Sequence, residues 1–264
     1  IYNAANKPEP IIFRQFFDRT SCTYTYLLGC NQTKECLLID PVLELVDRDL
    51  QFIKELDLKL KYVLNTHCHA DHITGSGTIK TKVKDVKSVI GNYNDVKADI
   101  KVKNGDTIKC GNTIILNVLE TPGHTANCVS YYDNNKTMIF TGDALFVRGC
   151  GRTDFQGGSA ATLYDSVTTK IFKLPESCRI FPAHDYKGRM FSTIKEEIKY
   201  NPRLGSGKTK KEFMDIMSKL NLSNPSKMHF AVPCNRLCGY PDDVKKIMDK
   251  IKKDEALKKN NASV

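Results

Sequence analysis

Histidine and aspartate side chains of the kind that bind metal ions lie in four short segments of this chain. The first segment places four of them within six residues, in the order His67, His69, Asp71 and His72. The other three segments are Thr-Pro-Gly-His124, Thr-Gly-Asp143 and Pro-Ala-His184-Asp185. Imidazole and carboxylate ligands together suit zinc, iron or manganese. Because so many neighbouring imidazoles would repel one another if they were protonated, we expect this set to bind metal.

The number of potential ligands fits two kinds of metal site. There are seven of them: His67, His69, Asp71, His72, His124, Asp143 and His184. Two metal ions bridged by Asp143 would form the centre of a binuclear zinc hydrolase. One metal ion held by two His and one carboxylate would leave open positions for O₂ and substrate on non-haem Fe(II). The ligand count alone leaves both open. The sixth histidine, His229, lies beside Phe230 without a ligand partner nearby, and we expect it to bind no metal.

Each metal-ligand segment directly follows a segment with the apolar pattern of a β-strand. The predicted strands are 11–17, 23–28, 36–39, 61–65, 113–119, 128–132, 137–140 and 179–182. Helical spacing of apolar residues predicts helices at 47–58 (with Leu60 in the same pattern), 163–174 and 244–251, and the capping box Thr209-x-x-Glu212 opens another through Leu220. Loops at strand ends commonly hold active-site groups, so we expect the ligands to converge. The pattern favours two sheet layers covered by helices and a mostly helical end.

Composition excludes several classes of protein. The chain has 264 residues, 41% of them hydrophobic, and no apolar run of the ~18 residues that a membrane helix needs. The net charge of +10 lies almost wholly in residues 187–264, where 18 Lys and Arg face 9 Asp and Glu. The lysines of residues 245–259 have only aliphatic and charged neighbours, so we expect a solvated helix face and no nucleic-acid partner. The ten scattered cysteines predict free thiols in a reducing compartment.

The ligand motifs and their surroundings resemble the metallo-β-lactamase superfamily. Within it they are most similar to the persulfide dioxygenases, also called sulfur dioxygenases. The similar segments are 65–77 (NTHCHADHITGSG), 140–146 (FTGDALF), 148–156 (RGCGRTDFQ), 182–186 (PAHDY), 201–203 (NPR) and 230–233 (FAVP). The resemblance implies an α+β fold, an αββα sandwich of two mixed β-sheets flanked by helices with a helical C-terminal end. It implies a catalytic domain at 1–241, followed by a basic helical extension at 242–264.

The resemblance also implies an activity and a division of labour among the ligands. One Fe(II) per chain would be bound by the catalytic residues His67, His124 and Asp143. The remaining residues, His69, Asp71, His72, His184 and Asp185, would bind no metal and would orient the iron ligands and water. The implied reaction converts glutathione persulfide, O₂ and water to sulfite and glutathione, in hydrogen sulfide catabolism. A mitochondrial matrix location (with the cytoplasm as the alternative), no membrane partner and a homodimer are further expectations.

Glutathione has two carboxylates, so its binding site should contain cations. Arg152 is the first candidate because a guanidinium can bind a carboxylate through two parallel hydrogen bonds. Arg203 and Tyr186 are further candidates, and Cys150 lies in a motif near the family's pocket. The alternative function is a glyoxalase II-type hydroxyacylglutathione hydrolase with a binuclear zinc site, although such an enzyme would carry Gly-His-Glu-Tyr where this chain has Pro182-Ala-His-Asp-Tyr. Cys234, Cys238 and the basic end have no predicted function.

Overall fold

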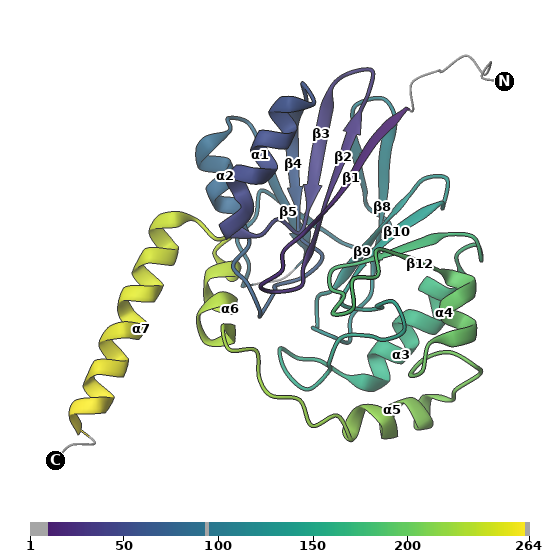
Figure 1. The fold of residues 1–264 in the computed structure, drawn as a ribbon. Helices are drawn as coiled ribbons and strands as arrows, with labels where there is room; N and C mark the ends of the chain where they lie inside the picture. Colours follow the sequence, from purple (N-terminus) through teal and green to yellow (C-terminus); the bar gives the residue numbers. More distant parts are fainter. Residues whose placement is uncertain (1–9, 93–94, 262–264) are drawn as a thin grey trace.

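Two six-stranded β-sheets face each other at the centre of the molecule (Figure 1). The computed structural model describes residues 10–92 and 95–261, with side chains as far as residue 254. The first sheet has the order β1 (Ile11–Phe17), β2 (Tyr24–Cys30), β3 (Glu35–Ile39), β4 (Lys59–Leu64), β5 (Lys87–Gly91), β6 (Ile100–Val102). The second has the order β12 (Ser192–Thr193), β11 (Arg179–Pro182), β10 (Met138–Gly142), β9 (Val129–Asp133), β8 (Ile114–Glu120), β7 (Thr107–Cys110).

Both sheets are mixed, as predicted. In the first sheet the pairs β3–β4, β4–β5 and β5–β6 are parallel, whereas β1–β2 and β2–β3 are antiparallel. In the second sheet β10 and β11 are parallel and the other pairs are antiparallel. Since parallel strands end at the same edge of a sheet, the loops after β3 and β4 start side by side, and so do the loops after β10 and β11.

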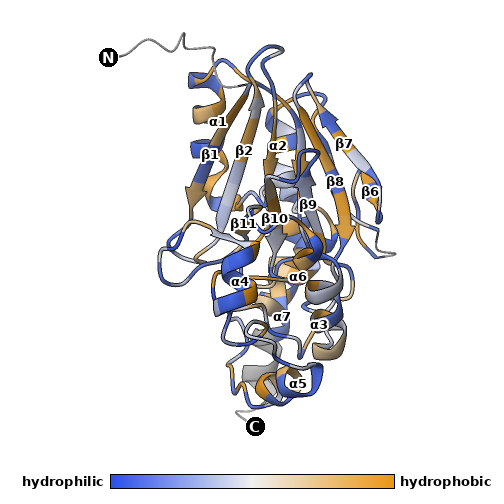
Figure 2. Cartoon of the chain, turned by 90° about the vertical axis from the view of Figure 1, so that its right-hand side faces the viewer, coloured by the Kyte–Doolittle hydropathy of each residue, from blue (hydrophilic) through white to orange (hydrophobic). Residues whose placement is uncertain are grey.

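The described residues form seven α-helices, most of which cover the outer faces of the sheets (Figure 1). They are α1 (Val46–Glu55), α2 (Ser76–Lys82), α3 (Ala160–Thr169), α4 (Ile194–Tyr200), α5 (Lys210–Ser218), α6 (Met228–Arg236) and α7 (Pro241–Asn261). The central apolar layer between the sheets includes Tyr26, Tyr131 and Phe140. A second layer joins the first sheet to α1 and α2, and a third joins the second sheet to α3, α4 and α5. The αββα prediction is therefore confirmed. Figure 2 shows that both α4 and α5 contain hydrophilic residues, coloured blue.

The C-terminal helices form a separate small cluster. Ala231 and Cys234 of α6 are buried with Ile73, and Val244 and Ile247 of α7 pack against them. Beyond these residues α7 extends away from the sheets (Figure 1). This confirms the helical end. The domain boundary after residue 241 stays a prediction, and residues 1–9 and 262–264 lie outside the described part. No helix described here has the length and apolar character needed to cross a bilayer.

The structure corrects two predicted helices. Helix α1 ends at Glu55, because Asp57 adopts a positive φ of 52° and Leu60 belongs to strand β4. The helix predicted at 163–174 is broken after Thr169, where Lys170 leaves helical geometry and its ammonium donates to the Glu120 carbonyl. A 3-10 helix, Ile171–Lys173, follows the break. Helices α2, α4 and α6 and the short strands β5, β6, β7 and β12 have no counterpart in the sequence prediction.

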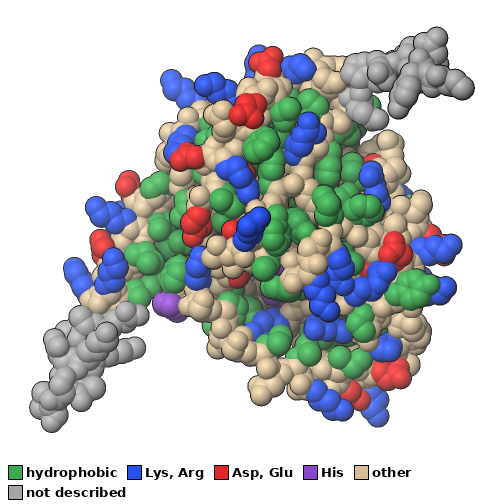
Figure 3. All heavy atoms as spheres, in the orientation of Figure 1, with side chains coloured by type: hydrophobic (Ala, Val, Ile, Leu, Met, Phe, Trp, Pro, Cys, Tyr) green, Lys and Arg blue, Asp and Glu red, His purple; other side chains and the backbone are tan. Residues whose placement is uncertain are grey.

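The structure also shows the state of the cysteines, the capping box of α5 and the distribution of surface charge. All ten cysteines are free and nine are buried, which confirms the absence of a disulfide framework. The predicted capping box at Thr209 and Glu212 is present. On the face seen in Figure 3, Lys and Arg side chains lie among Asp, Glu and apolar ones, including at the start of α7. Side chains of both signs are therefore mixed on this face.

Gly123 gives a test of how tightly helix α3 holds the turn before His124. Its φ is +136°, and a Cβ there would lie 2.3 Å from the Leu163 Cα. We expect Gly123→Ala to lower the free energy of unfolding by at least about 2 kcal/mol, since strain and a backbone clash add. Gly105→Ala is the control, because its φ is +87° with open space around it, and it should cost about 1 kcal/mol. Equal losses in urea unfolding would contradict this packing.

Candidate metal centre

The predicted ligands converge where the loops leave the sheets, and they form two groups. His67, His124 and Asp143 make one group, and His69, Asp71, His72 and His184 make the other. Within each group the ligand atoms lie within 4.8 Å of one another. All seven residues come from loops that follow β4, β8, β10 and β11. His229 lies in α6 against the ring of Phe230 and belongs to neither group.

The first group presents three unshared electron pairs to one point. The Asp143 Oδ2 lies 3.4 Å from the Nε2 of His124 and 3.9 Å from the Nε2 of His67. The Nδ1 of His124 donates to the Arg152 carbonyl at 2.7 Å, so its Nε2 is the unprotonated nitrogen. Burial lowers the pKa of both His67 and His124, which keeps their rings neutral. Two neutral imidazoles and a carboxylate are a donor set that fits one divalent transition metal.

A buried hydrogen-bond network fixes the orientation of His67. The Thr66 hydroxyl donates to the Asp40 Oδ2 at 2.8 Å, and it can therefore accept from the Nδ1 of His67 at 3.0 Å. The backbone amide of Thr66 donates to the other oxygen of Asp40. Such contacts behind a ligand set its tautomer and its direction.

His184 joins the two groups through carboxylates. Its Nδ1 donates to the Asp143 Oδ1 at 2.7 Å and its Nε2 donates to the Asp71 Oδ2 at 3.0 Å. Burial alone would lower the pKa of His184, but these two carboxylates raise it well above its usual value. Burial alone would likewise raise the pKa of Asp143, but His184 and His124 hold it well below the usual range. His184 is therefore an imidazolium that has no free nitrogen for a metal.

The other two histidines of the second group each have one bonded nitrogen. The Nε2 of His69 lies 3.0 Å from Asp40, and the Nδ1 of His72 lies 2.9 Å from Asp71, with Thr23 nearby. The His69 Nδ1 and the His72 Nε2 are buried, and no described residue bonds to them. This group therefore combines two unused nitrogen atoms with one fully bonded histidine.

Sequence reasoning missed several buried polar residues of this centre. Asp40 follows strand β3 just as the ligand segments follow theirs, so the same signal could have identified it. Thr66 precedes His67 and lies in the segment 65–77 that resembles the family, but nothing in the sequence indicates that its hydroxyl bonds to Asp40. Thr23 reaches the centre from the first sheet, and Asn235 reaches it from α6. Neither of these two residues has a spacing signal in the sequence.

A cavity of about 740 Å³ opens onto both groups of ligands and is rich in basic side chains. Four of its five basic residues already pair with carboxylates: Arg148 with Glu196 and Glu197, Arg152 with Asp154, Arg189 with Asp185, and Lys227 with Glu44. Arg203 donates from Nη1 to the Cys150 carbonyl at 2.9 Å. Within the described part of the chain it has no carboxylate partner. Of the five basic side chains of this cavity, Arg203 therefore has the fewest interactions with acidic groups.

The predicted substrate residue Arg152 lines the cavity but is fully occupied. Its Nε and Nη2 donate to the two carboxylate oxygens of Asp154, each at 2.6 Å. Its Nη1 donates to the Ser223 carbonyl at 2.6 Å, and its guanidinium lies over the Phe155 ring. The side chain is 12% exposed. In this structure Arg152 thus fastens the segment around Ser223 to the cavity wall, and its contact with substrate stays a prediction.

The other predicted residues lie at different depths. Tyr186 is 69% exposed and stacks on the His184 ring, with 6.2 Å between centroids. Cys150 is buried beside Met217, and burial raises the pKa of its thiol to about 11. The Asp185 carboxylate is also buried but turns away from the ligands, accepting from the Lys187 amide and from Arg189. It therefore shapes the loop that contains Tyr186.

Comparisons with known proteins show which family shares this centre. Residues 22–184 match the family model described as the metallo-beta-lactamase superfamily. A protein of Homo sapiens named "Persulfide dioxygenase ETHE1, mitochondrial" is 52% identical over 230 residues, which cover 87% of this chain and 89% of that protein. The chain belongs to the persulfide dioxygenase family. A crystal structure of ETHE1 from Myxococcus xanthus agrees with a TM-score of 0.82 at 50% identity, covering 86% of this chain and 99% of that one.

Hydrolases related to the alternative function match less of the chain. The "Hydroxyacylglutathione hydrolase cytoplasmic" of Arabidopsis thaliana is 36% identical over 168 residues, which cover 62% of this chain and 64% of that protein. Glyoxalase II is thus a distant relative of this persulfide dioxygenase family member, and the expected family is confirmed. The His and Asp groups of the centre support a metal cofactor.

The role of Arg152 as a fastener predicts a change in protease sensitivity. We expect Arg152→Ala to release residues 222–224, which lie in a segment without regular structure, and to speed cleavage there about 10-fold or more in limited proteolysis. Lys210→Ala is the control, since Lys210 lies on nearby α5 and its loss removes only an exposed ion pair with Asp165 of α3. Equal cleavage of the two variants would argue that Arg152 does not hold this segment.

Proposed function

We propose that this protein oxidises glutathione persulfide with O₂ and water to sulfite and glutathione, using one Fe(II) per chain held by His67, His124 and Asp143. The observation that supports it most directly is the convergence of two neutral imidazole nitrogens and one carboxylate oxygen beside a cavity of about 740 Å³. The family named for persulfide dioxygenation has the matching sequence at 52% identity. When bound, Fe(II) supplies the redox chemistry that triplet O₂ requires and that zinc lacks.

The residues of this chain do the positioning. The Arg152 carbonyl and the Thr66 hydroxyl keep the Nδ1 protons of His124 and His67 away from the metal position. His184 keeps Asp143 ionised and holds its Oδ1, so that Oδ2 faces the two histidines. Tyr186 covers the outer face of His184 beside the cavity. Sulfur is oxidised and O₂ is reduced in this reaction, and the glutathione thiol leaves as the S–S bond breaks.

The electrostatics of the cavity favour Arg203 as the contact for a glutathione carboxylate. Arg148, Arg152 and Arg189 are committed to carboxylates of the chain, and a substrate would have to compete with those partners. Arg203 has no carboxylate partner among the described residues and is oriented by the Cys150 carbonyl. Lys227 pairs with Glu44 at 3.3 Å on the surface, a weak contact that a second substrate carboxylate could replace. Cys150 remains a protonated thiol in the cavity wall.

We also propose a mitochondrial location, chiefly because the related mammalian proteins are named mitochondrial. The free state of all ten cysteines agrees with a reducing compartment such as the matrix.

Oxygen uptake by iron-loaded protein tests the function. With glutathione persulfide as substrate, we expect uptake of one O₂ for each sulfite formed, and about one iron per chain by metal analysis. His124→Ala should lose most of its bound iron and at least about 99% of its uptake, because two ligands hold a divalent ion poorly. His229→Ala is the matched control, since that imidazole touches neither ligand group.

Two outcomes would contradict the proposal. Two zinc ions per chain with cleavage of S-lactoylglutathione would identify a hydrolase, and the unused nitrogens of His69 and His72 would then be ligands. Absence of persulfide-dependent O₂ uptake in the iron-loaded wild type would exclude the dioxygenase reaction.

Replacement of Arg203 tests the carboxylate contact. We expect Arg203→Met to raise KM for glutathione persulfide 10- to 100-fold, the loss typical of one charge-assisted hydrogen-bonded pair. Iron content should not change, and a small persulfide without carboxylates should show no effect. Lys195→Met, which breaks an exposed pair with Glu176 outside the cavity, is the charge-matched control. An unchanged KM in Arg203→Met would assign the carboxylates elsewhere.

A further inference from the structure

Asn235 of helix α6 makes three hydrogen bonds to the backbone of the segment that contains the first metal-ligand motif. Its Nδ2 donates to the carbonyls of His69 and His72, both at 2.8 Å. Its Oδ1 accepts from the backbone amide of Thr74, also at 2.8 Å. Asn235 is 3% exposed. One buried side chain therefore satisfies three backbone groups of a single turn.

The ligand turn needs such support because it has no regular structure of its own. Residues 66–73, between β4 and α2, form no helix or strand. Their other contacts with distant parts of the chain include Asp40, which bonds to Thr66 and His69, and the Gln156 side chain, which donates to the Cys68 carbonyl at 3.2 Å. The position of His67 thus depends on partners that the turn does not provide itself.

The turn after α6 is packed against the end of the same segment. The Gly77 amide donates to the Cys238 carbonyl at 2.7 Å, and a Cβ on Gly77 would lie 2.4 Å from the Tyr240 nitrogen. Cys238 and Gly239 have positive φ values of 64° and 66°, which turn the chain back toward Thr74. Helix α6 is therefore fixed to the segment at two points, Asn235 and the Cys238 turn.

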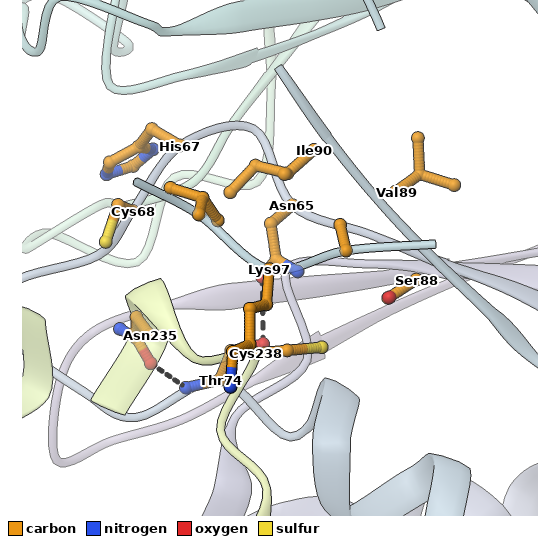
Figure 4. A pocket seen from close by; sticks show the side chains of 12 residues that line it. Asn65, His67, Cys68, Thr74, Ser88, Val89, Ile90, Lys97, Asn235 and Cys238 are labelled. Carbon is orange, nitrogen blue, oxygen red and sulfur yellow. Dashed lines mark hydrogen bonds between the residues drawn. The ribbon is translucent and has the colours of Figure 1, made fainter. Parts of the chain in front are cut away.

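Figure 4 shows these elements around a small cavity lined by His67, Cys68, Asn235 and Cys238. The Asn235 side chain points at Thr74, and the hydrogen bond is drawn between them. The cavity measures about 10 Å³, which is at most the space of one water molecule. The turn is thus pressed closely onto α6, and there is little room for it to relax if the hydrogen bonds are removed.

From this geometry we infer that Asn235 is a positioning residue for the metal centre, which acts by holding the backbone of residues 69–74 and so the direction of His67. Helix α6 would thus have a role beyond packing. The inference rests on the proposed function only in that His67 binds the metal. Asn235 touches neither the metal position nor the substrate cavity; it acts through the turn.

The test compares two variants of Asn235 with a neighbour on the same helix. Asn235→Ala removes all three hydrogen bonds, and Asn235→Asp keeps the size but places a carboxylate oxygen against two carbonyls. Cys234→Ala is the control, because Cys234 is fully buried in the cluster with Ile73 and its side chain has no hydrogen bond to the turn among the described residues. The full chain is used throughout, with and without bound metal.

Two measurements separate positioning from stability. Hydrogen–deuterium exchange over residues 66–75 should rise about 10-fold in both Asn235 variants. The dissociation constants for Fe(II) and for Zn(II), obtained by competition with a chelator, should rise 10- to 100-fold, as for other contacts behind a metal ligand. Cys234→Ala should stay within about two-fold on both, even if its melting temperature falls. Zinc affinity and hydrogen–deuterium exchange can be measured without enzymatic activity. Both measurements would therefore stay informative if the protein proved not to be a dioxygenase.

Two results would overturn the inference. Metal affinity in Asn235→Ala within two-fold of the wild type would show that the hydrogen bonds do not set the position of His67. An equal loss in Cys234→Ala would show that any loosening of α6 has the same effect. Neither result would alter the O₂ uptake of the wild-type protein, which tests the proposed function separately.

Discussion

The two oxygens of the Asp143 carboxylate face different partners, and the arrangement of the other metal-centre residues depends on this. One carboxylate oxygen is bound by the His184 imidazolium at 2.7 Å, and the other faces the Nε2 atoms of His67 and His124. Burying an ionised carboxylate costs free energy unless an opposite charge compensates it. His184 provides that compensation and lets Asp143 stay ionised where it is buried at the edge of the sandwich. The same bonds occupy both nitrogens of His184, which weakens the second group as a metal site.

The order of strands explains why these groups can meet at all. Asp40 and the ligand turn leave β3 and β4, which are parallel neighbours in the first sheet, whereas Asp143 and His184 leave β10 and β11, which are parallel neighbours in the second. Both pairs of loops open at the same edge of the sandwich, and His124 joins them from the end of β8. A mixed sheet in each layer is what brings two adjacent strand ends together in both.

Much of this could be predicted from the sequence, and the failures have physical causes. The ligand residues were found because His and Asp at these spacings are rare outside metal sites, and the two-layer fold followed from short strands with helices between them. Helix α6 was missed because Pro233 interrupts its pattern, and α2 because its buried face is largely Ser76 and Gly77. Arg152 was predicted to contact a substrate carboxylate, and the sequence did not show that its guanidinium also pairs with Asp154.

The basic charge of the chain has little direct consequence for the cavity. Arg148, Arg152 and Arg189 are neutralised by carboxylates that lie close by in space, two of them within four residues in the sequence. These pairs fix loops around the metal centre and leave the field in the cavity much weaker than a count of basic residues suggests. Among the described residues, Arg203 is the guanidinium of this cavity without a carboxylate partner, and the Cys150 carbonyl orients it. The proposed recognition of an anionic substrate therefore depends on the shape of the wall around Cys150 rather than on net charge.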